Sequence, residues 1–243
     1  MKLFRRDEEL DALRKRLTAR RSVLLHGPSG VGKTLLLACI RPEFPQLLCC
    51  LQSSSPQVVF RVLADALMHE KDAAMLRAMA SRCLEGITAV SLKGIVTRVL
   101  SGSKYMIILD HLNRPSHSLA ATIRELMISC SVPVIAVARS AHMEDAGFAA
   151  PMFPDRGDKL AIKNFDPETA EDFVRAVAAE RKLTVENFSE FVARVVEFSA
   201  GNPGAIVKMV EMAGLSKYRL GDHVKLSPLY IDFRIESASA NSE

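Results

Sequence analysis

Short runs of consecutive apolar residues alternate, over the first two thirds of the chain, with longer segments in which apolar residues recur every three or four positions. A short apolar run bounded by glycine, proline or serine is typical of a buried strand, and the longer spacing is typical of an amphipathic helix. The short runs predict strands over residues 22–27, 46–52, 105–110, 132–138 and 158–165. The longer segments predict helices over residues 8–20, 33–40 and 117–130, and about three more over 56–101. Because strands and helices alternate, we expect an α/β fold with a parallel sheet flanked by helices.

The pattern changes after Phe165, where helices follow one another without an intervening strand. Asp166 is a typical N-cap residue and Pro167 suits the first position of a helix, so a helix is predicted to begin there. Two more helices are predicted over residues 186–199 and 203–216. This part of the chain therefore predicts a small all-helical domain.

We expect three regions in the chain. They are an α/β domain over residues 1–165, the helical domain over 166–217 and a C-terminal extension over 218–243. Within the extension, residues 223–236 are expected to add a strand or to pack on the sheet. The polar residues 237–243 are expected to be disordered, because they offer little apolar surface to bury.

Composition narrows the class of protein only a little. Apolar residues make up 49% of the 243 positions and charged residues 25%, as in an ordinary globular protein. The net charge of +4 permits contact with nucleic acid without requiring it. The five cysteines form no CxxC pair, so free thiols in a reducing compartment are expected. No signal peptide or membrane span is apparent, so we expect a cytoplasmic protein without membrane contact.

The segment "GPSGVGKT" matches the phosphate-loop pattern GxxxxGK[ST] and lies between a predicted strand and a predicted helix. Glycines let the backbone N–H groups turn toward phosphate oxygens, and the following helix adds its positive N-terminal dipole. Lys33 is expected to reach the β- and γ-phosphates, and the Thr34 hydroxyl to bind Mg²⁺. The predicted nucleotide-binding residues here are Gly27, Pro28, Ser29, Gly30, Val31, Gly32, Lys33, Thr34 and Leu35.

Asp110 ends the apolar run "YMIILD" and is the predicted second protein ligand of Mg²⁺, beside Thr34. Alternatively, an aspartate at this position could cap a turn. The extra predicted strand over residues 46–52 indicates that the strand carrying Asp110 is not the next one along the chain after the phosphate loop. This is typical of P-loop ATPases of the additional-strand type.

These motifs give the sequence a resemblance to AAA+ and STAND-type P-loop ATPases, close to the archaeal-ATPase and origin-initiator group. "LFRRDEEL", residues 3–10, is similar to the family segment hhGRExEL, which helps to enclose adenine. The resemblance implies that Arg6 takes part in that contact, although Arg5 stands where the family has glycine. It also implies a helical lid after the α/β domain, and ATP or ADP with Mg²⁺ as ligands.

The same resemblance assigns roles to three more residues. Arg139, in "VIAVARS", stands where STAND proteins place a phosphate-sensing arginine. Pro203, in "SAGNPGAI", is similar to the lid proline near the base, and Gly204 replaces the arginine that often follows as a second sensor. Arg156 lies where AAA+ proteins place an arginine finger for a neighbouring subunit. The alternatives are a surface arginine at 139, a helix-starting proline at 203, and an ion pair of Arg156 with a neighbouring aspartate, either Asp155 or Asp158.

His111 follows Asp110, where many such enzymes have a glutamate that acts on the attacking water. We therefore predict a slow, Mg²⁺-dependent ATPase that acts as a nucleotide-dependent switch on an unidentified protein partner, with assembly of several copies as an option. A hydrolysis-deficient ATP-binding scaffold is one alternative. A DNA-associated helper ATPase of the transposition or replication type is another, and it depends on a basic stripe, which consists of Arg14, Lys15, Arg16, Arg20 and Arg21. A small-molecule kinase is disfavoured by the helical domain.

Overall fold

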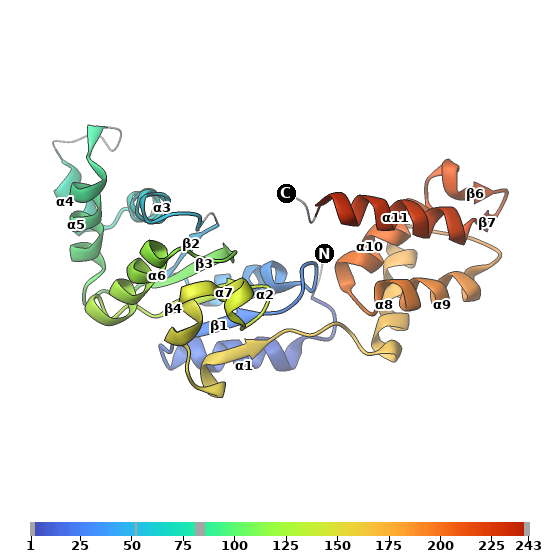
Figure 1. Cartoon of the computed structure of the whole chain (residues 1–243), viewed down its shortest axis with the longest axis horizontal. Coiled ribbons are helices and arrows are strands. Elements are labelled where there is room, and N and C mark those ends of the chain that lie inside the picture. The colour runs from blue at the N-terminus through green and yellow to red at the C-terminus, as the bar shows by residue number, and fades with distance from the viewer. Residues whose placement is uncertain (1–2, 52, 81–85, 241–243) are drawn as a thin grey trace. The chain divides into compact units, whose positions relative to one another are not determined.

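The computed structural model describes residues 3–51, 53–80 and 86–240 (Figure 1). It divides into two compact units. The sheet unit comprises Arg6–Gly27 and Lys33–Ile162, and the helical unit comprises Met1–Arg5, Pro28–Gly32 and Lys163–Glu243. The predicted domain limits at residues 165 and 217 stay a prediction.

Five parallel strands form the centre of the sheet unit (Figure 1). In chain order they are β1 (Val23–His26), β2 (Leu47–Cys50), β3 (Met106–Leu112), β4 (Val134–Ala138) and β5 (Lys159–Ala161). The order in the sheet is β2-β3-β4-β1-β5. β4 therefore lies between β1, which leads into the phosphate loop, and β3, which carries Asp110. This confirms the predicted fold class, an additional-strand P-loop sheet flanked by helices.

Helices of the sheet unit bury their apolar faces against these strands. The α-helices are α1 (Asp7–Thr18), α2 (Lys33–Ile40), α3 (Pro56–His69), α4 (Ala73–Met79), α5 (Ala89–Leu100), α6 (His117–Arg124) and α7 (Met143–Ala146). Leu63 of α3, Val96 of α5 and Ile123 of α6 belong to one buried core with the strands. The predicted helix over residues 117–130 ends its α-helical part at Arg124. Its last turn, Glu125–Ser129, is a π-helix, in which the Cys130 N–H donates to Glu125 O.

The helical unit has a core of its own. It contains α8 (Pro167–Glu180), α9 (Phe188–Ser199), α10 (Pro203–Ala213), a hairpin of β6 (Arg219–Leu220) and β7 (His223–Val224), and α11 (Leu226–Ala240). Asp166 is the expected N-cap of α8 and accepts a hydrogen bond from the Thr169 N–H. Phe191 and Ile206 lie in the buried core of this unit.

The C-terminal segment differs from expectation. Residues 223–236 add no strand to the five-stranded sheet; they supply β7 and most of α11 of the helical unit. The apolar residues Leu229 and Phe233 are four positions apart, so they lie on one helix face, and both are buried in the core of the helical unit. Residues 237–240, expected to be disordered, continue α11, and residues 241–243 lie outside the described residues.

No helix among the described residues is both long and apolar enough to cross a membrane. The four cysteines in the described part of the chain, Cys39, Cys49, Cys50 and Cys130, are free thiols, and Cys83 lies outside it.

Candidate nucleotide site

The loop after β1 has a backbone that only glycine adopts easily at two positions. Gly30 has φ 78° and Gly32 has φ 101°, values at which a side chain would be strained. α2 begins directly after Gly32, at Lys33. The sequence pattern GxxxxGK[ST] thus corresponds to a strand, a glycine-dependent loop and a helix N-terminus, the arrangement that binds phosphate in P-loop proteins.

Thr34 and Asp110 are brought together although they are 76 positions apart in the chain. The Thr34 hydroxyl donates to Asp110 Oδ2 at 3.2 Å, and Asp110 Oδ1 accepts from the His111 N–H at 2.8 Å. Two oxygens about 3 Å apart can both bind one Mg²⁺ ion, because octahedral ligands at about 2.1 Å from the metal lie about that far from each other. The residues therefore fit a magnesium ion held by one hydroxyl and one carboxylate. Among the described residues, no group of three or more His, Cys, Asp and Glu could hold a metal ion.

Positive groups gather around the loop. Lys33 Nζ donates to Gly27 O at 2.6 Å. Burial lowers the pKa of Lys33, Asp110 acts to raise it and Arg139 to lower it. Burial also lowers the pKa of His26, at the end of β1, and so do the nearby charges of Lys159, His142 and Lys33. Such a cluster favours a ligand with several negative charges, such as a polyphosphate.

Arg139 directly follows β4 and is exposed. Because β3 and β4 are parallel neighbours, Arg139 and Asp110 come from the same edge of the sheet. Arg156 lies in a short 3₁₀ helix, Arg156–Asp158, just before β5, and it is also exposed. Asp158 pairs with Arg21 at 2.8 Å, and no ion pair joins Arg156 to Asp155 or Asp158 within the described residues. The alternative in which a neighbouring aspartate holds Arg156 is therefore wrong.

Arg6 and Pro203 are both buried, in different units. Arg6 is 7% exposed, and its NH1 group donates to Glu9 at 2.7 Å. Pro203 is the first residue of α10, whose N-cap is Asn202. Leu35 is half-buried in the first turn of α2. For these three residues, the predicted contact with nucleotide stays a prediction.

The start of α10 reaches loop residues that belong to the same unit. The Gly204 N–H donates to Gly30 O at 2.9 Å, and Asn202 Nδ2 donates to Ser29 O at 2.9 Å. A Cβ atom at position 204 would lie 2.9 Å from Gly30 Cα. The sequence showed only that Gly204 replaces an arginine. Its close backbone contact, and the hydrogen bond of Asn202, were missed because they depend on residues more than 170 positions away.

The backbone at His111 does not have the extended conformation of a strand residue. Its φ is 55°, and the pairing of β3 with β4 shifts between Leu109 and Leu112. The imidazole is 74% exposed, and its Nε2 lies 3.8 Å from Asp110 Oδ2, too far for a hydrogen bond. The backbone turns the His111 side chain out of the strand while Asp110 stays 2% exposed.

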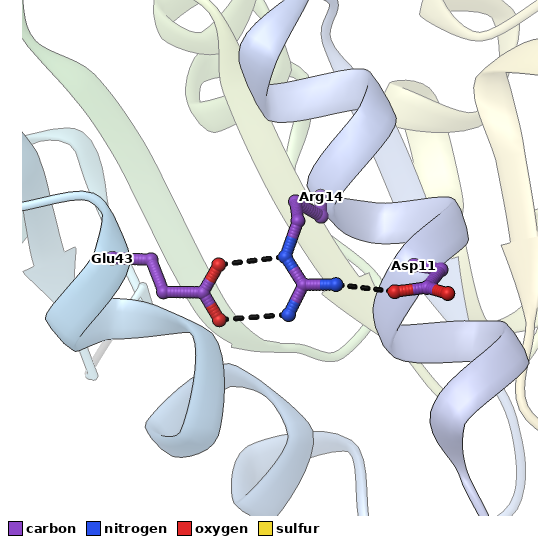
Figure 2. Close-up of polar contacts among 3 residues, drawn as sticks. All are labelled: Asp11, Arg14 and Glu43. Carbon is purple, nitrogen blue, oxygen red and sulfur yellow. Dashed lines mark hydrogen bonds and ion pairs between the residues drawn. The ribbon is translucent and has the colours of Figure 1, made fainter.

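The arginines of the basic stripe, which lie in α1 and just after it, bind groups of the sheet unit. Figure 2 shows Arg14 Nε and NH2 donating to the two carboxylate oxygens of Glu43, at 2.6 and 2.8 Å, while NH1 contacts Asp11. Arg16 donates to Gly157 O, and Arg21 pairs with Asp158. Arg20 donates to three carbonyl groups, those of Ser103, Lys104 and Tyr105. Four of the five basic residues that motivated the DNA-associated alternative therefore bind groups of the sheet unit, and two of them, Arg14 and Arg21, bind carboxylates.

Strand order, phosphate loop and the Thr34–Asp110 contact define a P-loop nucleotide-binding protein of the additional-strand type. More particularly, the model of the AAA ATPase domain family matches residues 2–135, more than half of the chain, and the chain belongs to this family. Family and fold together identify it as an ATP-binding protein of the ATPase class.

Three solved structures are similar in fold. The Walker-type ATPase PABY2304 of Pyrococcus abyssi is 16% identical, with a TM-score of 0.61 over 99% of this chain and 77% of that one. A STAND protein with a tetratricopeptide-repeat sensor, PH0952 of Pyrococcus horikoshii, is also 16% identical, with a TM-score of 0.55 over 96% of this chain. This chain spans only 32% of that protein. A single-residue variant of Thermotoga maritima RuvB is 15% identical, with a TM-score of 0.53 over 95% of this chain and 67% of that one. A search of curated proteins gives no match.

Proposed function

We propose that this protein is a slow, Mg²⁺-dependent ATPase that works as a nucleotide-dependent switch on a macromolecular partner. The observation that carries the proposal is the contact of Thr34 with Asp110, at 3.2 Å, beside a complete phosphate loop. Family membership supports the ATPase class. The switch and its partner are our inference from the two-unit organisation, in which loop residues 28–32 belong with the helical unit.

Each candidate residue has a proposed task. Backbone N–H groups of residues 27–35 hold the α- and β-phosphates, and Lys33 holds the β- and γ-phosphates. Thr34 and Asp110 bind Mg²⁺, which neutralises charge on the phosphate oxygens when it is bound. Arg139 contacts the γ-phosphate, and Arg6 and Pro203 lie near the base. Arg156, exposed and without an aspartate partner beside it, acts on the ATP of a neighbouring copy in a homo-oligomer.

Hydrolysis is expected to be slow because of His111. Rapid hydrolysis needs a group that accepts a proton from the attacking water or orients that water. The imidazole of His111 is 74% exposed and turned out of β3, so it is poorly placed for that task. ATP would then persist long enough to act as a switching ligand, provided that ATP and ADP favour different conformations.

Steady-state ATP turnover, measured at several protein concentrations with Lys33→Ala as the blank, tests the proposal. We expect slow turnover above the blank that rises per subunit with concentration and falls in Arg156→Ala. Turnover independent of concentration would exclude a residue supplied by a second copy. Equal affinities and equal conformations with ATP and ADP would contradict the switch.

A hydrolysis-deficient ATP-binding scaffold is the second candidate, and the placement of His111 favours it. It predicts ATP binding that depends on Lys33, with no turnover above the Lys33→Ala blank. The DNA-associated alternative has lost part of its motivating feature, because Arg14 and Arg21 of the basic stripe are paired with Glu43 and Asp158 of the sheet unit. DNA affinity that falls with rising salt would restore it.

A further inference from the structure

A cavity lies beyond the end of β3 that carries Asp110. Its volume is about 690 Å³, within the range of small-molecule sites, roughly 300–1,000 Å³. The described residues that line it are Leu51, Ser53, Ser54, His111, Asn113, Arg114, Pro115, Ser116 and Leu119. No residue of the phosphate loop is among them. The cavity is therefore formed by the segments that follow β2 and β3, next to Asp110 but apart from the loop.

The described lining carries hydrogen-bond donors and positive charge but no carboxylate. Asn113 and Ser54 form no side-chain hydrogen bond within the described part of the chain, and the His111 imidazole lies 3.8 Å from its nearest carboxylate. Ser53 is 5% exposed, and its hydroxyl has only long contacts, 3.4 Å to Cys50 O and 3.6 Å to Cys50 Sγ. Hydroxyl hydrogen bonds are normally 2.5–3.0 Å long, so this buried group keeps most of its capacity to donate.

Arg114 is fixed without being neutralised. Its Nε donates to Glu144 O and its backbone N–H donates to Asp145 O, both at 2.8 Å. No carboxylate of the described residues lies within ion-pair distance of its guanidinium. The two terminal nitrogens of Arg114 can therefore form the paired hydrogen bonds that arginine gives to a carboxylate or phosphate.

Two backbone positions at the cavity are strained. His111 has φ 55° and Arg114 has φ 47°, and neither is a glycine. Such conformations cost about 1–3 kcal/mol each and are found at sites where the side-chain direction matters. Here the turn between these two residues brings His111, Asn113 and Arg114 together in the lining of the cavity.

We propose that this cavity is a second ligand site, which binds an organic anion of metabolite size through a carboxylate or phosphate group. Arg114 forms the charged contact, and His111, Asn113, Ser53 and Ser54 donate further hydrogen bonds. Leu51, Pro115 and Leu119 contact the apolar part of the ligand. The proposal does not rest on hydrolysis, because no lining residue belongs to the phosphate loop.

Calorimetric titration of the full chain with succinate and with glycerol 3-phosphate tests the site. The chain is first saturated with a non-hydrolysable ATP analogue and Mg²⁺, so that the probes cannot occupy the phosphate loop. We expect saturable binding of at least one probe, and the same binding in Lys33→Ala without nucleotide. Binding of succinate alone identifies a carboxylate site, and binding of glycerol 3-phosphate alone identifies a phosphate site.

Two variants and one control locate the binding. Arg114→Gln is expected to weaken it at least about tenfold, because a charge-assisted hydrogen bond is lost. Asn113→Asp keeps the shape of an exposed side chain and is expected to weaken binding by repulsion. Arg77→Gln is the matched control, since Arg77 is also exposed and also donates through Nε to a backbone carbonyl, that of Ala73. Neither probe saturating at millimolar concentration, or equal losses in Arg114→Gln and Arg77→Gln, would overturn the proposal.

Discussion

β1 and β3 belong to one parallel sheet, yet the backbone at their carboxyl ends differs in structure. β1 ends in a loop in which glycines occupy the left-handed positions, and a helix starts at Lys33. β3 continues two residues past Asp110, with a histidine in a left-handed conformation. The first end has every feature that phosphate binding needs. The second places a carboxylate beside Thr34 but turns the following side chain out of the strand, an arrangement that fits the proposed slow hydrolysis.

The largest effect is expected on nucleotide binding, when the carboxylate at the end of β3 is replaced. In Asp110→Asn, an amide takes the place of the carboxylate beside Thr34, and amides bind Mg²⁺ poorly. We expect the gain in ATP affinity that Mg²⁺ provides to fall at least about tenfold. ATP affinity with and without Mg²⁺ measures this gain. The exposed Asp155→Asn is the control, and an unchanged gain in Asp110→Asn would mean that Asp110 does not bind the metal.

The next largest effect is expected on stability, when the contact between the phosphate loop and α10 is disturbed. In Gly204→Ala, the new Cβ would lie 2.9 Å from Gly30 Cα, so the loop or α10 must shift. We expect a loss of about 1–3 kcal/mol in the free energy of unfolding, measured by denaturant titration. Gly94→Ala, within α5, meets no atom within 4 Å and should instead stabilise the protein by about 0.5–1 kcal/mol. A Gly204→Ala variant as stable as the parent would show that the contact between α10 and the loop accommodates a Cβ atom.

The smallest effect is expected on stability, when the backbone conformation of His111, near the end of β3, is relieved of its steric cost. His111→Gly should stabilise the fold by up to about 1 kcal/mol, because glycine adopts φ 55° without steric cost. His117→Gly is the matched control and should destabilise, since His117 begins α6. Thermal unfolding of both variants measures the difference. Destabilisation by His111→Gly would mean that the imidazole contributes more than its backbone conformation costs.

Much of the sheet unit could be predicted because its signals are local. An apolar run and a glycine pattern specify β1 and the loop, and the extra run over residues 46–52 predicts that β3 is not adjacent to β1. The left-handed turn at His111 could not be predicted, because it accompanies a register shift between β3 and β4, in which three steps along β3 face two along β4. The close approach of Gly204 to Gly30 likewise has no local signal. The tail was mispredicted because Leu229 and Phe233 show helical spacing only over a short segment.

The arginines of α1 and of the segment that follows it also have an evolutionary consequence. Three arginines bind segments that precede strands. Arg14 binds the segment before β2, Arg20 the segment before β3, and Arg21 the segment before β5. Arg14 is bound by a carboxylate, so relatives should exchange it together with Glu43, as a covarying pair. Arg20 binds backbone carbonyls, which every amino acid supplies, and it should be retained without any covarying partner. In an alignment of relatives, positions 14 and 43 should therefore covary, whereas position 20 should be invariant without a covarying partner.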